Sequence, residues 1–520
     1  MIVCPQPLAA EAGLSVLRAG GNAVDAAVAT AFVQGVIDPM MCGLGGCGVM
    51  LVRRADGRDE VIEFYARAGS RVREGQWESR FVREAADRYG YVLEGWVNDC
   101  GYQSVGVPGT VAGLAEALRR HGSLSWAEAL QPAISQARRG CLVTGTVHDY
   151  WTRDVGPDVV PHDRRIQWTP EARRIYTRDG ALFPVGAIIA NPDLASTYER
   201  LAAAGPDDFY RGEIAAAIAA DFQANGGFVS ADDLAWYRPR VSPPLRGSYR
   251  GRQVVVPGPP AGGLTLLQML NYLEGFDLGA FGWPSAEAAR ARVEAMAWAV
   301  GEREAHLADP LFATIRVDEL AAKAHAAAAR VLHESPTTTH VGVVDAAGNA
   351  VSLTHTLGAS SGVVTPGLGF NYNNYLNCFD PRRGRINSLA PGKTRVTMMV
   401  PTMVFGSQGG ALEVVAGAPG GPRIVTGVLQ TLLNLLDHRM SPVEAVSAPR
   451  LDLQRDQVQA ELRMPADVLD GLRAAGYRVN RRALGYDPYF AKAQVIQVGP
   501  DGALRGASDP RGDGGIALTA

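Results

Sequence analysis

Cysteine is scarce in this sequence. The chain of 520 residues has only six cysteines, at positions 4, 42, 47, 100, 141 and 378. They are scattered along the chain, and none belongs to a CxxC pair. This distribution argues against a disulfide framework and favours reduced thiols in a cytoplasmic protein.

An excess of charge of one sign is also absent. The 50 Lys and Arg residues nearly balance the 53 Asp and Glu residues, which gives a net charge of −3 and an isoelectric point near 6.3. Domains that bind DNA or RNA usually carry a basic patch or stripe. No nucleic-acid partner is therefore expected.

Long hydrophobic runs are missing as well. No apolar stretch reaches the roughly 18 residues of a membrane-spanning helix, so we expect no membrane association. The first residues, Met1–Pro7, have neither the basic start nor the apolar core of a secretory signal. Together with the cysteine pattern, this predicts a cytoplasmic location.

Glycine and proline are abundant, with 60 and 32 residues. They predict many tight turns and close backbone contacts. Apolar periodicity predicts helices over residues 8–19 and 23–36, and Ala-rich segments predict further helices over 284–307 and 318–332.

Residues 43–48 match the pattern GxGxxG. A dinucleotide-binding loop of this kind needs a strand before it and a helix after it. Here the predicted helix 23–36 comes before the motif, and a strand-like run at 49–52 comes after it. We therefore expect a turn where backbones pass close together, and no nucleotide or other cofactor.

Residues 358–362 match GxSxG, the nucleophile elbow of α/β-hydrolases. The elbow needs a helix after its serine, but residues 363–367 include a proline and do not favour a helix. The only histidine that follows the motif is His438, at the end of an apolar helix, where a capping or surface role is expected. The elbow is therefore disfavoured.

Two histidines, His340 and His355, lie close enough in sequence to suggest a metal pair. Neither an HExxH motif nor a cluster of carboxylates accompanies them. No metal site is expected.

The most informative stretch begins at Pro336 and runs through three threonines into a strand-like segment. The turn Ala-Ala-Gly-Asn at 346–349 and a second strand-like run at 350–357 follow, which predicts a β-hairpin. If the hairpin is centred on residue 347, Thr338 faces Thr356 across the ladder. A threonine becomes a nucleophile when a base activates it, and the free α-amine left by chain cleavage is such a base.

The motifs resemble those of the γ-glutamyltranspeptidase family from about residue 5 to residue 515. Thr338-Thr339-His340 and the hairpin resemble the start of the family's small subunit. Further similar blocks lie at 19–27, 106–113, 416–424 and 506–511. The resemblance implies an α+β fold, the four-layer α-β-β-α sandwich of Ntn hydrolases.

Members of this family cut themselves before the first threonine of a T-T-H sequence. The resemblance therefore implies cleavage between Thr337 and Thr338, with a register ambiguity of one residue within the triple threonine. The large fragment 1–337 and the small fragment 338–520 are expected to form an interleaved heterodimer. A dimer of these heterodimers remains open.

The resemblance also implies catalytic roles. Thr338 is the expected nucleophile, and its α-amine is the base. Thr356 is expected to orient the nucleophile through its hydroxyl. The N–H groups of Gly420 and Gly421, in a P-G-G segment, are expected to form the oxyanion hole, because no Cβ blocks approach there.

The substrate-binding half departs from the family pattern. The family places an arginine in an F-R-E segment, and the matching residues here are 64–67. Tyr65 replaces that arginine, although Arg67 follows two positions later. The aspartate that holds the substrate amine is replaced by Cys378, and a neighbouring glutamine is replaced by Tyr375. The other expected pocket residues are Gly358, Thr397 and Met398. Arg67 and Arg395 are candidates to bind a substrate carboxylate.

Three hypotheses follow. The first is a self-cleaving amidohydrolase that acts on a small carboxylated amide such as oxamate, as some relatives do, while others are cephalosporin acylases. The second is a true γ-glutamyl transferase or glutathione hydrolase with a rearranged pocket. The third is a catalytically silent relative with a binding or assembly role.

Overall fold

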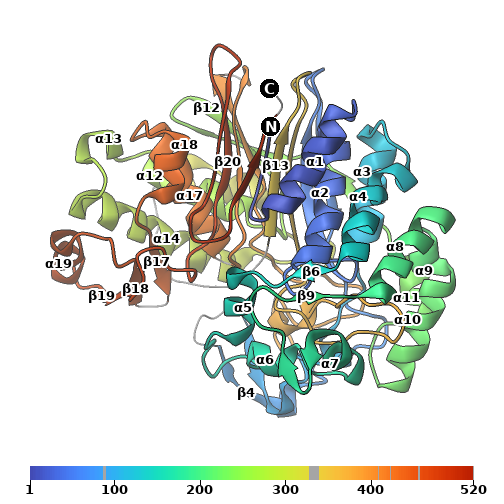
Figure 1. The fold of residues 1–520 in the computed structure, drawn as a ribbon. Helices are drawn as coiled ribbons and strands as arrows, with labels where there is room; N and C mark the ends of the chain where they lie inside the picture. Colours follow the sequence, from blue (N-terminus) through green and yellow to red (C-terminus); the bar gives the residue numbers. More distant parts are fainter. Residues whose placement is uncertain (86–89, 327–338, 408, 422, 455–456, 519–520) are drawn as a thin grey trace.

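The molecule is built around two stacked antiparallel sheets with helices on their outer faces (Figure 1). The computed structural model describes residues 1–85, 90–326, 339–407, 409–421, 423–454 and 457–518. Helices α12, α14 and α17 lie on one side of the sheets in this view, and α1 and α2 lie on the other.

The larger sheet contains both strands of the predicted hairpin. Within the described residues it has seven strands, and every neighbouring pair is antiparallel. Their order is β10 (Arg240–Ser242), β3 (Asp59–Phe64), β2 (Cys47–Arg53), β14 (Ala350–Thr356), β13 (Thr339–Val344), β1 (Ile2–Cys4) and β22 (Gly515–Ala517).

The smaller sheet is also antiparallel throughout and has six strands in the part of the chain that is described. Their order is β11 (Leu245–Tyr249), β12 (Arg252–Val256), β15 (Thr402–Ser407), β16 (Leu412–Gly417), β20 (Gln494–Val498) and β21 (Leu504–Ser508).

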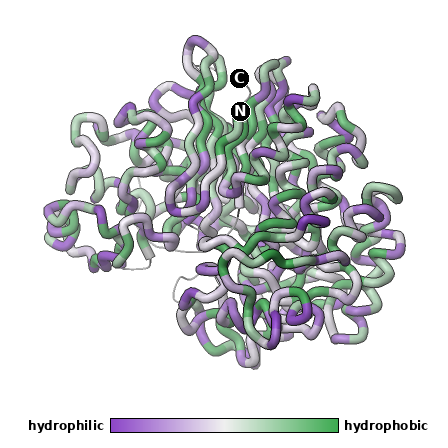
Figure 2. Tube along the Cα trace, viewed as in Figure 1, coloured by the Kyte–Doolittle hydropathy of each residue, from purple (hydrophilic) through white to green (hydrophobic). Residues whose placement is uncertain are grey.

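Alternation along the strands explains why the two sheets stack. In β2, Cys47, Val49 and Leu51 face the second sheet, where they pack in one cluster with residues such as Met403 and Val415. The intervening Met50 and Val52 belong to the core beneath the helices. Successive side chains of a strand point to opposite faces, so a strand that is apolar on both faces is buried between two layers. Figure 2 shows this central region mostly in green.

Helices cover the outer face of each sheet and form the other two layers. The larger sheet is covered by α1 (Pro7–Arg18), α2 (Ala23–Ile37) and α3 (Thr110–His121), with α4 (Trp126–Arg139) and α8 (Pro192–Ala204) outside them. The smaller sheet is covered by α12 (Gly263–Leu273), α14 (Ala286–His306), α17 (Arg423–Leu436) and α18 (Pro442–Ser447). This is the four-layer α-β-β-α sandwich that the resemblance implied.

The predicted N-terminal helices are confirmed within one residue at each end. Helix α2 begins with a capping box, in which the Asn22 side chain accepts from the N–H groups of Val24 and Asp25. Every residue of α2 is buried. A helix that is apolar on all sides is stable only inside a core, which is where α2 lies, between α1 and the sheet.

The remaining elements surround this sandwich. One group lies below α4 and α8 in Figure 1, and another extends α14 and α17 outward. The first group is α5 (Gly145–Thr152), α6 (His162–Arg165), α7 (Pro170–Tyr176), α9 (Asp208–Arg211), α10 (Glu213–Ala224), α11 (Ala231–Trp236) and the pairs β4 (Phe81–Glu84) with β5 (Tyr91–Leu93), β6 (Cys141–Leu142) with β9 (Ile188–Ile189) and β7 (Thr177–Arg178) with β8 (Ala181–Leu182). The second group is α13 (Leu278–Phe281), α19 (Ala466–Ala474) and the sheet of β17 (Leu451–Gln454), β18 (Gln457–Ala460) and β19 (Arg478–Arg481).

One helix prediction is wrong. The segment 318–332 was expected to form a single helix, but it contains two one-turn helices, α15 (Val317–Leu320) and α16 (Lys323–Ala326). A turn at 321–322 separates them, and Leu320 and Ala326 are packed into different core clusters. Tertiary packing has overridden the helix propensity of the alanines. Residues 327–338 lie outside the described part of the chain.

Both predicted fragments contribute strands to each sheet. In the larger sheet, β13 lies between β14 and β1, so a strand from the start of the chain pairs with one that begins at Thr339. In the smaller sheet, β12 pairs with β15. The cleavage boundary itself stays a prediction. In the described residues, no helix is both long and apolar enough to cross a membrane.

Candidate active site

The hairpin has the register that the sequence predicts. Thr339 pairs with His355, and Val344 pairs with Ala350, so paired residue numbers sum to 694 along the whole ladder. In the turn, the Asp345 carboxylate accepts from the N–H groups of Ala347 and Asn349, each at 2.9 Å. Thr338 and Thr337 lie outside the described residues.

Thr356 ends strand β14 in the centre of the larger sheet. It is 2% exposed and pairs with Cys47 of β2 on its other side. Its Oγ1 accepts a hydrogen bond of 2.8 Å from the backbone N–H of Gly358. The hydroxyl is therefore held in one orientation and keeps its own proton to donate to another group.

The glycine-rich turn at 43–48 supports this strand end. Helix α2 comes before the turn and strand β2 begins inside it, which is the wrong order for a nucleotide-binding loop. A Cβ atom on Gly46 would lie 2.6 Å from the carbonyl oxygen of Thr356, and one on Gly45 would overlap the carbonyl oxygen of Asn371. The expectation of a close backbone crossing is confirmed, since only glycine fits there.

Gly420 and Gly421 lie in the loop between β16 and α17. Their φ angles are +140° and +63°, which an L side chain rarely adopts. A Cβ atom on Gly420 would lie 2.6 Å from the Cα atom of Ala491, so the loop passes tightly against that segment. The carbonyl of Pro419 accepts from the N–H of Lys492 at 3.0 Å. Residue 422 lies outside the description.

A buried ion pair holds the segment on which this glycine loop rests. Arg450 donates to the carbonyl of Ala491 and pairs with Asp509 at 2.6 Å. Asp509 also accepts from the N–H of Ala493 at 2.9 Å. The side chains of Arg450 and Asp509 are only 2% and 0% exposed, so the pair is shielded from water and from salt.

His340 connects the hairpin to the strand that leads into the glycine loop. A Cβ atom on Gly417, the last residue of β16, would overlap the His340 ring. The Nδ1 atom of His340 is 2.9 Å from the hydroxyl oxygen of Thr354. Only two residues separate Gly417 from Gly420, so the hairpin and the glycine loop are close neighbours.

Both hairpin histidines have structural partners. His355 Nε2 lies 2.8 Å from Oε1 of Gln34, whose amide group donates to Gln6. Burial lowers the pKa of His340 and the pKa of His355 to about 3 each, so both rings are neutral. Among the described residues, no group of three metal-ligating side chains was found.

Tyr375, Cys378 and Arg395 form one cluster. The Arg395 guanidinium lies 4.2 Å from the centre of the Tyr375 ring, and it donates to the Asn377 side chain at 2.6 Å. It also donates to the Cys378 sulfur. Arg395 is 4% exposed. A buried cation therefore lies beside position 378, where the resemblance implies an acidic residue in the family.

Gly358 joins this cluster to Thr356. A Cβ atom on Gly358 would overlap the side-chain oxygen of Asn374 and would lie 4.0 Å from Nη2 of Arg395. The φ angle of Gly358 is +71°. Glycine here lets the chain turn directly after Thr356 and brings the arginine close to the strand end.

Two residues that support the cluster were missed from the sequence. The Asn374 amide donates to the Asp99 carboxylate at 3.0 Å, and Asp99 pairs with the buried Arg165 at 2.5 Å. Arg165 also donates to the carbonyl of Ser360 at 2.6 Å. Asp99 and Arg165 lie far from each other and from residue 374 in the chain, and no local pattern marks them.

Tyr65 and Arg67 line a neighbouring pocket. Its wall also includes the ion pair of Glu63 with Arg240, at 2.7 Å, and Asp309. Burial raises the pKa of Glu63. Tyr65 shares a buried cluster with Cys47 and Tyr375, so it lies between the pocket and the strand end. In the described part of the chain, the Arg67 guanidinium forms no ion pair, and its carbon lies 5.9 Å from the centre of the Tyr237 ring.

Thr397 and Met398, which follow Arg395 in the chain, are buried. The N–H of Thr397 donates to the carbonyl of Pro260 at 3.0 Å. The sulfur of Met398 lies 3.3 Å from an N–H nitrogen of Arg303. Both side chains are therefore fixed, with 3% and 1% exposure.

The GxSxG segment does not form a nucleophile elbow. Strand β14 comes before Ser360, but residues 363–368 contain no helix. The Ser360 hydroxyl accepts from the N–H of Gly362 at 3.2 Å and is fully buried. His438, two residues after the end of α17, is half-buried beside Trp283, with ring centres 6.5 Å apart.

The sequence is similar to those of known proteins. A model of the family described as Gamma-glutamyltranspeptidase matches residues 9–519. The Acylase ACY 1 proenzyme of Pseudomonas sp. (strain SE83) is 38% identical, over 99% of this chain and 92% of its own length. The Glutathione hydrolase proenzyme of Escherichia coli (strain K12) is 33% identical, over 98% of this chain and 90% of its own.

The fold is also found among solved structures. Cephalosporin acylase from Bacillus halodurans superposes with a TM-score of 0.88 at 29% identity, and the match covers 99% of this chain and 95% of that one. The family match spans nearly the whole sequence, and the curated relatives are named as enzymes and as proenzymes. The chain therefore belongs to the gamma-glutamyltranspeptidase family, whose members are hydrolases and acyltransferases with the Ntn-hydrolase fold.

Proposed function

We propose that this chain is a self-processing amidohydrolase whose nucleophile is Thr338. The observation that carries the proposal is the register of β13 and β14. If this register continued by one pair, it would place residue 338 opposite Thr356, whose hydroxyl is oriented by Gly358. The names of the relatives, which are proenzymes, also support a precursor that is cut.

The proposed chemistry has two halves. After cleavage, the α-amine of Thr338 takes the proton from its own hydroxyl, which attacks the carbonyl carbon of the substrate amide. An α-amine titrates near pH 8, so a useful fraction is unprotonated at neutral pH. The N–H groups of Gly420 and Gly421 stabilise the oxyanion, and the amine leaves with a proton. Water then attacks the acyl-enzyme and releases the acid.

Cleavage would divide the chain into residues 1–337 and 338–520. Because both parts contribute strands to each sheet, the fragments would stay together as a heterodimer. Separating them would require breaking the ladders of β13 with β1 and of β15 with β12. Any dimer of these heterodimers is a further proposal.

The preferred acyl group carries a carboxylate and lacks an α-ammonium. Arg395 is a buried cation that contacts Cys378, where the family pattern has an acidic residue. An ammonium group beside this guanidinium is repelled, while a carboxylate is attracted. Arg67 offers a second cation in the neighbouring pocket. A small carboxylated amide such as oxamate fits these charges.

Self-cleavage is tested by intact mass and gel analysis of the purified protein. We expect two fragments, with the new N-terminus at Thr338, and an uncut chain for Thr338→Ala. Thr337→Ala is the matched control and should still be cut. A chain that stays uncut in the wild type would favour the silent relative and refute the proposal.

Substrate preference is tested with a pair of anilides. N-glutaryl and γ-glutamyl p-nitroanilide differ only in the α-ammonium, so their ratio of kcat/KM isolates that group. We expect faster hydrolysis of the glutaryl compound, and ammonia release from oxamate. A preference for the γ-glutamyl anilide would instead support a glutathione hydrolase, the activity named for the Escherichia coli relative.

A further inference from the structure

Among the described residues, Arg292 is a buried cation without a carboxylate partner. It lies on α14 and is 0% exposed. Its only hydrogen bond within the described residues runs from Nη2 to the side-chain oxygen of Asn434, on α17, at 3.1 Å. The guanidinium carbon lies 3.6 Å from the centre of the Trp283 ring. Contact with a ring face attracts a cation but does not neutralise it.

The carboxylate of Asp437, which acts on Arg292 through space, already accepts hydrogen bonds from other groups. Its Oδ1 accepts from Arg250 at 3.0 Å, and its Oδ2 accepts from the Tyr249 hydroxyl at 2.8 Å. Glu274, next to Arg250, is paired with Lys323. Among the described residues of this neighbourhood, three cations, Arg250, Arg292 and Lys323, are matched by two carboxylates, Asp437 and Glu274.

Several buried nitrogens in the same place have no hydrogen-bond partner within the described chain. They are Nε and Nη1 of Arg292, Nε1 of Trp283 and Nε2 of His438. The rings of Trp283 and His438 have centres 6.5 Å apart, and Arg292 stacks on Trp283. The arginine and tryptophan nitrogens can only donate, and a neutral histidine can donate from Nε2. Burial and the charge of Arg292 lower the pKa of His438 to about 4, so its ring is neutral.

We propose that Arg292, Trp283 and His438 form a buried binding site for a small inorganic anion such as chloride. Buried polar groups in proteins are almost always paired, and an unpaired buried charge is strongly unfavourable. A cluster of donors with one excess positive charge calls for an acceptor that carries one negative charge. A halide ion meets both needs and has no hydrogens to clash with the donors.

The site connects two helices that cover the smaller sheet. Arg292 comes from α14, while Asn434 and His438 come from the end of α17 and the residues that follow it. The anion would therefore stabilise the packing of this helical layer. Gly420 and Gly421 lie before the opposite end of α17, so the site is separate from the proposed active site.

The test uses the full chain with bromide as the probe. Crystals grown without halide and soaked in sodium bromide should show an anomalous peak within hydrogen-bonding distance of Nε or Nη1 of Arg292. In solution, the melting temperature should rise saturably with bromide or chloride, relative to sodium gluconate at the same ionic strength.

Variants separate this site from general salt effects. Arg292→Met should abolish the halide-dependent shift in melting temperature. Arg290→Met is the matched control, because Arg290 lies on the same helix but is exposed and paired with Glu294 at 2.7 Å. The Arg290→Met protein should keep the halide-dependent shift in melting temperature. If Arg292→Met does not fold, the bromide map of the wild type decides. Absence of a bromide peak at Arg292, or an equal shift in a folded Arg292→Met protein, would overturn the proposal in favour of ordered water.

Discussion

Replacement of Asp509 with asparagine tests whether buried charges hold the proposed oxyanion loop. The two oxygens of Asp509 accept four hydrogen bonds. Oδ1 accepts from Nη1 and the backbone N–H of Arg511 at 2.8 and 3.0 Å. Oδ2 accepts from the N–H of Ala493 at 2.9 Å and pairs with Arg450 at 2.6 Å. Asparagine keeps the shape of the side chain. However, its amide group, which is a donor, would face either the two donors that bind Oδ1 or the two donors that bind Oδ2.

The expected cost follows from burial. Arg450 would keep its position, 2% exposed, without its carboxylate, whereas Arg511 would retain Glu461 at 2.7 Å. Removal of one partner from a buried ion pair typically costs about 3–5 kcal/mol. Since whole proteins are stable by only about 5–15 kcal/mol, this is a large fraction of the free energy of unfolding. Displacement of Ala491 and Lys492 should also slow self-cleavage.

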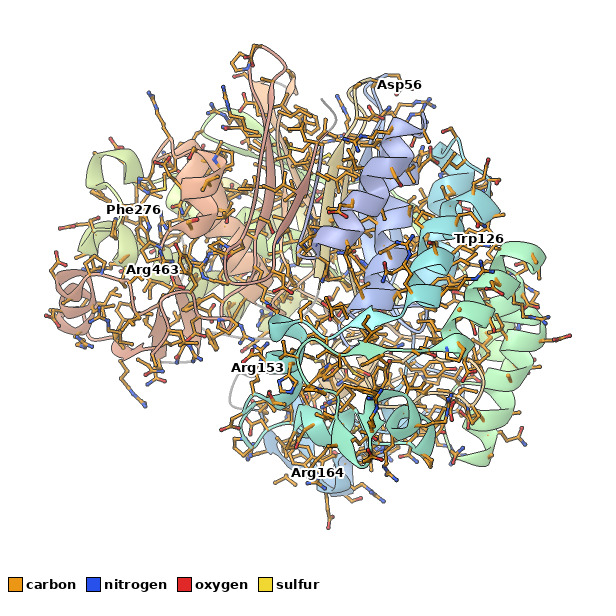
Figure 3. All side chains as sticks on the ribbon, in the orientation of Figure 1. Asp56, Trp126, Arg153, Arg164, Phe276 and Arg463 are labelled. Carbon is orange, nitrogen blue, oxygen red and sulfur yellow. The ribbon has the colours of Figure 1, made fainter. Side chains whose placement is uncertain are left out.

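The assay is urea unfolding followed by tryptophan fluorescence, alongside the rate of self-cleavage. Asp56→Asn is the control, because Asp56 pairs with Arg58 on an exposed turn (Figure 3). Its unfolding midpoint should match that of the wild type. The reasoning is refuted if Asp509→Asn unfolds at the wild-type midpoint and cleaves itself at the wild-type rate.

Three other predictions concern the site. Thr356→Val keeps the side-chain shape but loses the hydroxyl, so the processed enzyme should lose on the order of 10²-fold in kcat with its fold intact. Gly420→Ala should block self-cleavage because its Cβ would lie 2.6 Å from a backbone atom, whereas Gly145→Ala, with open space around it, should be cut normally on gels. The pKa of His355 is about 3 in the folded protein and near 6.5 in the unfolded chain. The neutral ring therefore contributes fully to the free energy of unfolding above about pH 6.5. This contribution is lost by about 1.4 kcal/mol per pH unit as the pH falls toward 3. His355→Gln should flatten the decline of the urea midpoint between about pH 6 and pH 4, and an unchanged decline would contradict this assignment.

Local features of the fold were predictable because they depend on local chemistry. The first two helices follow from apolar periodicity and from their terminal residues. The register of the hairpin follows from the position of Gly348, whose φ angle of +85° suits its turn. The glycines at 43–48 also predicted a close backbone crossing, which the structure shows. The roles of Thr338, Gly420 and Gly421 stay predictions.

Other local patterns were misleading where packing decided the outcome. Alanine-rich sequence predicted one helix over 318–332, but two short helices are present in its described part, because Leu320 and Ala326 enter different clusters. Propensity is a weak guide when a segment must fit a surface formed by distant residues.

The sequence by itself determined the order of elements, the hairpin and the family, because periodicity, turn residues and motifs are read along the chain. Only the tertiary structure decided which charges meet. It paired Arg165 with Asp99, brought Arg395 to Cys378, and gave Arg292 no carboxylate partner among the described residues. Electrostatic energies depend on distance and burial, and neither quantity is encoded in the spacing of residues along the sequence.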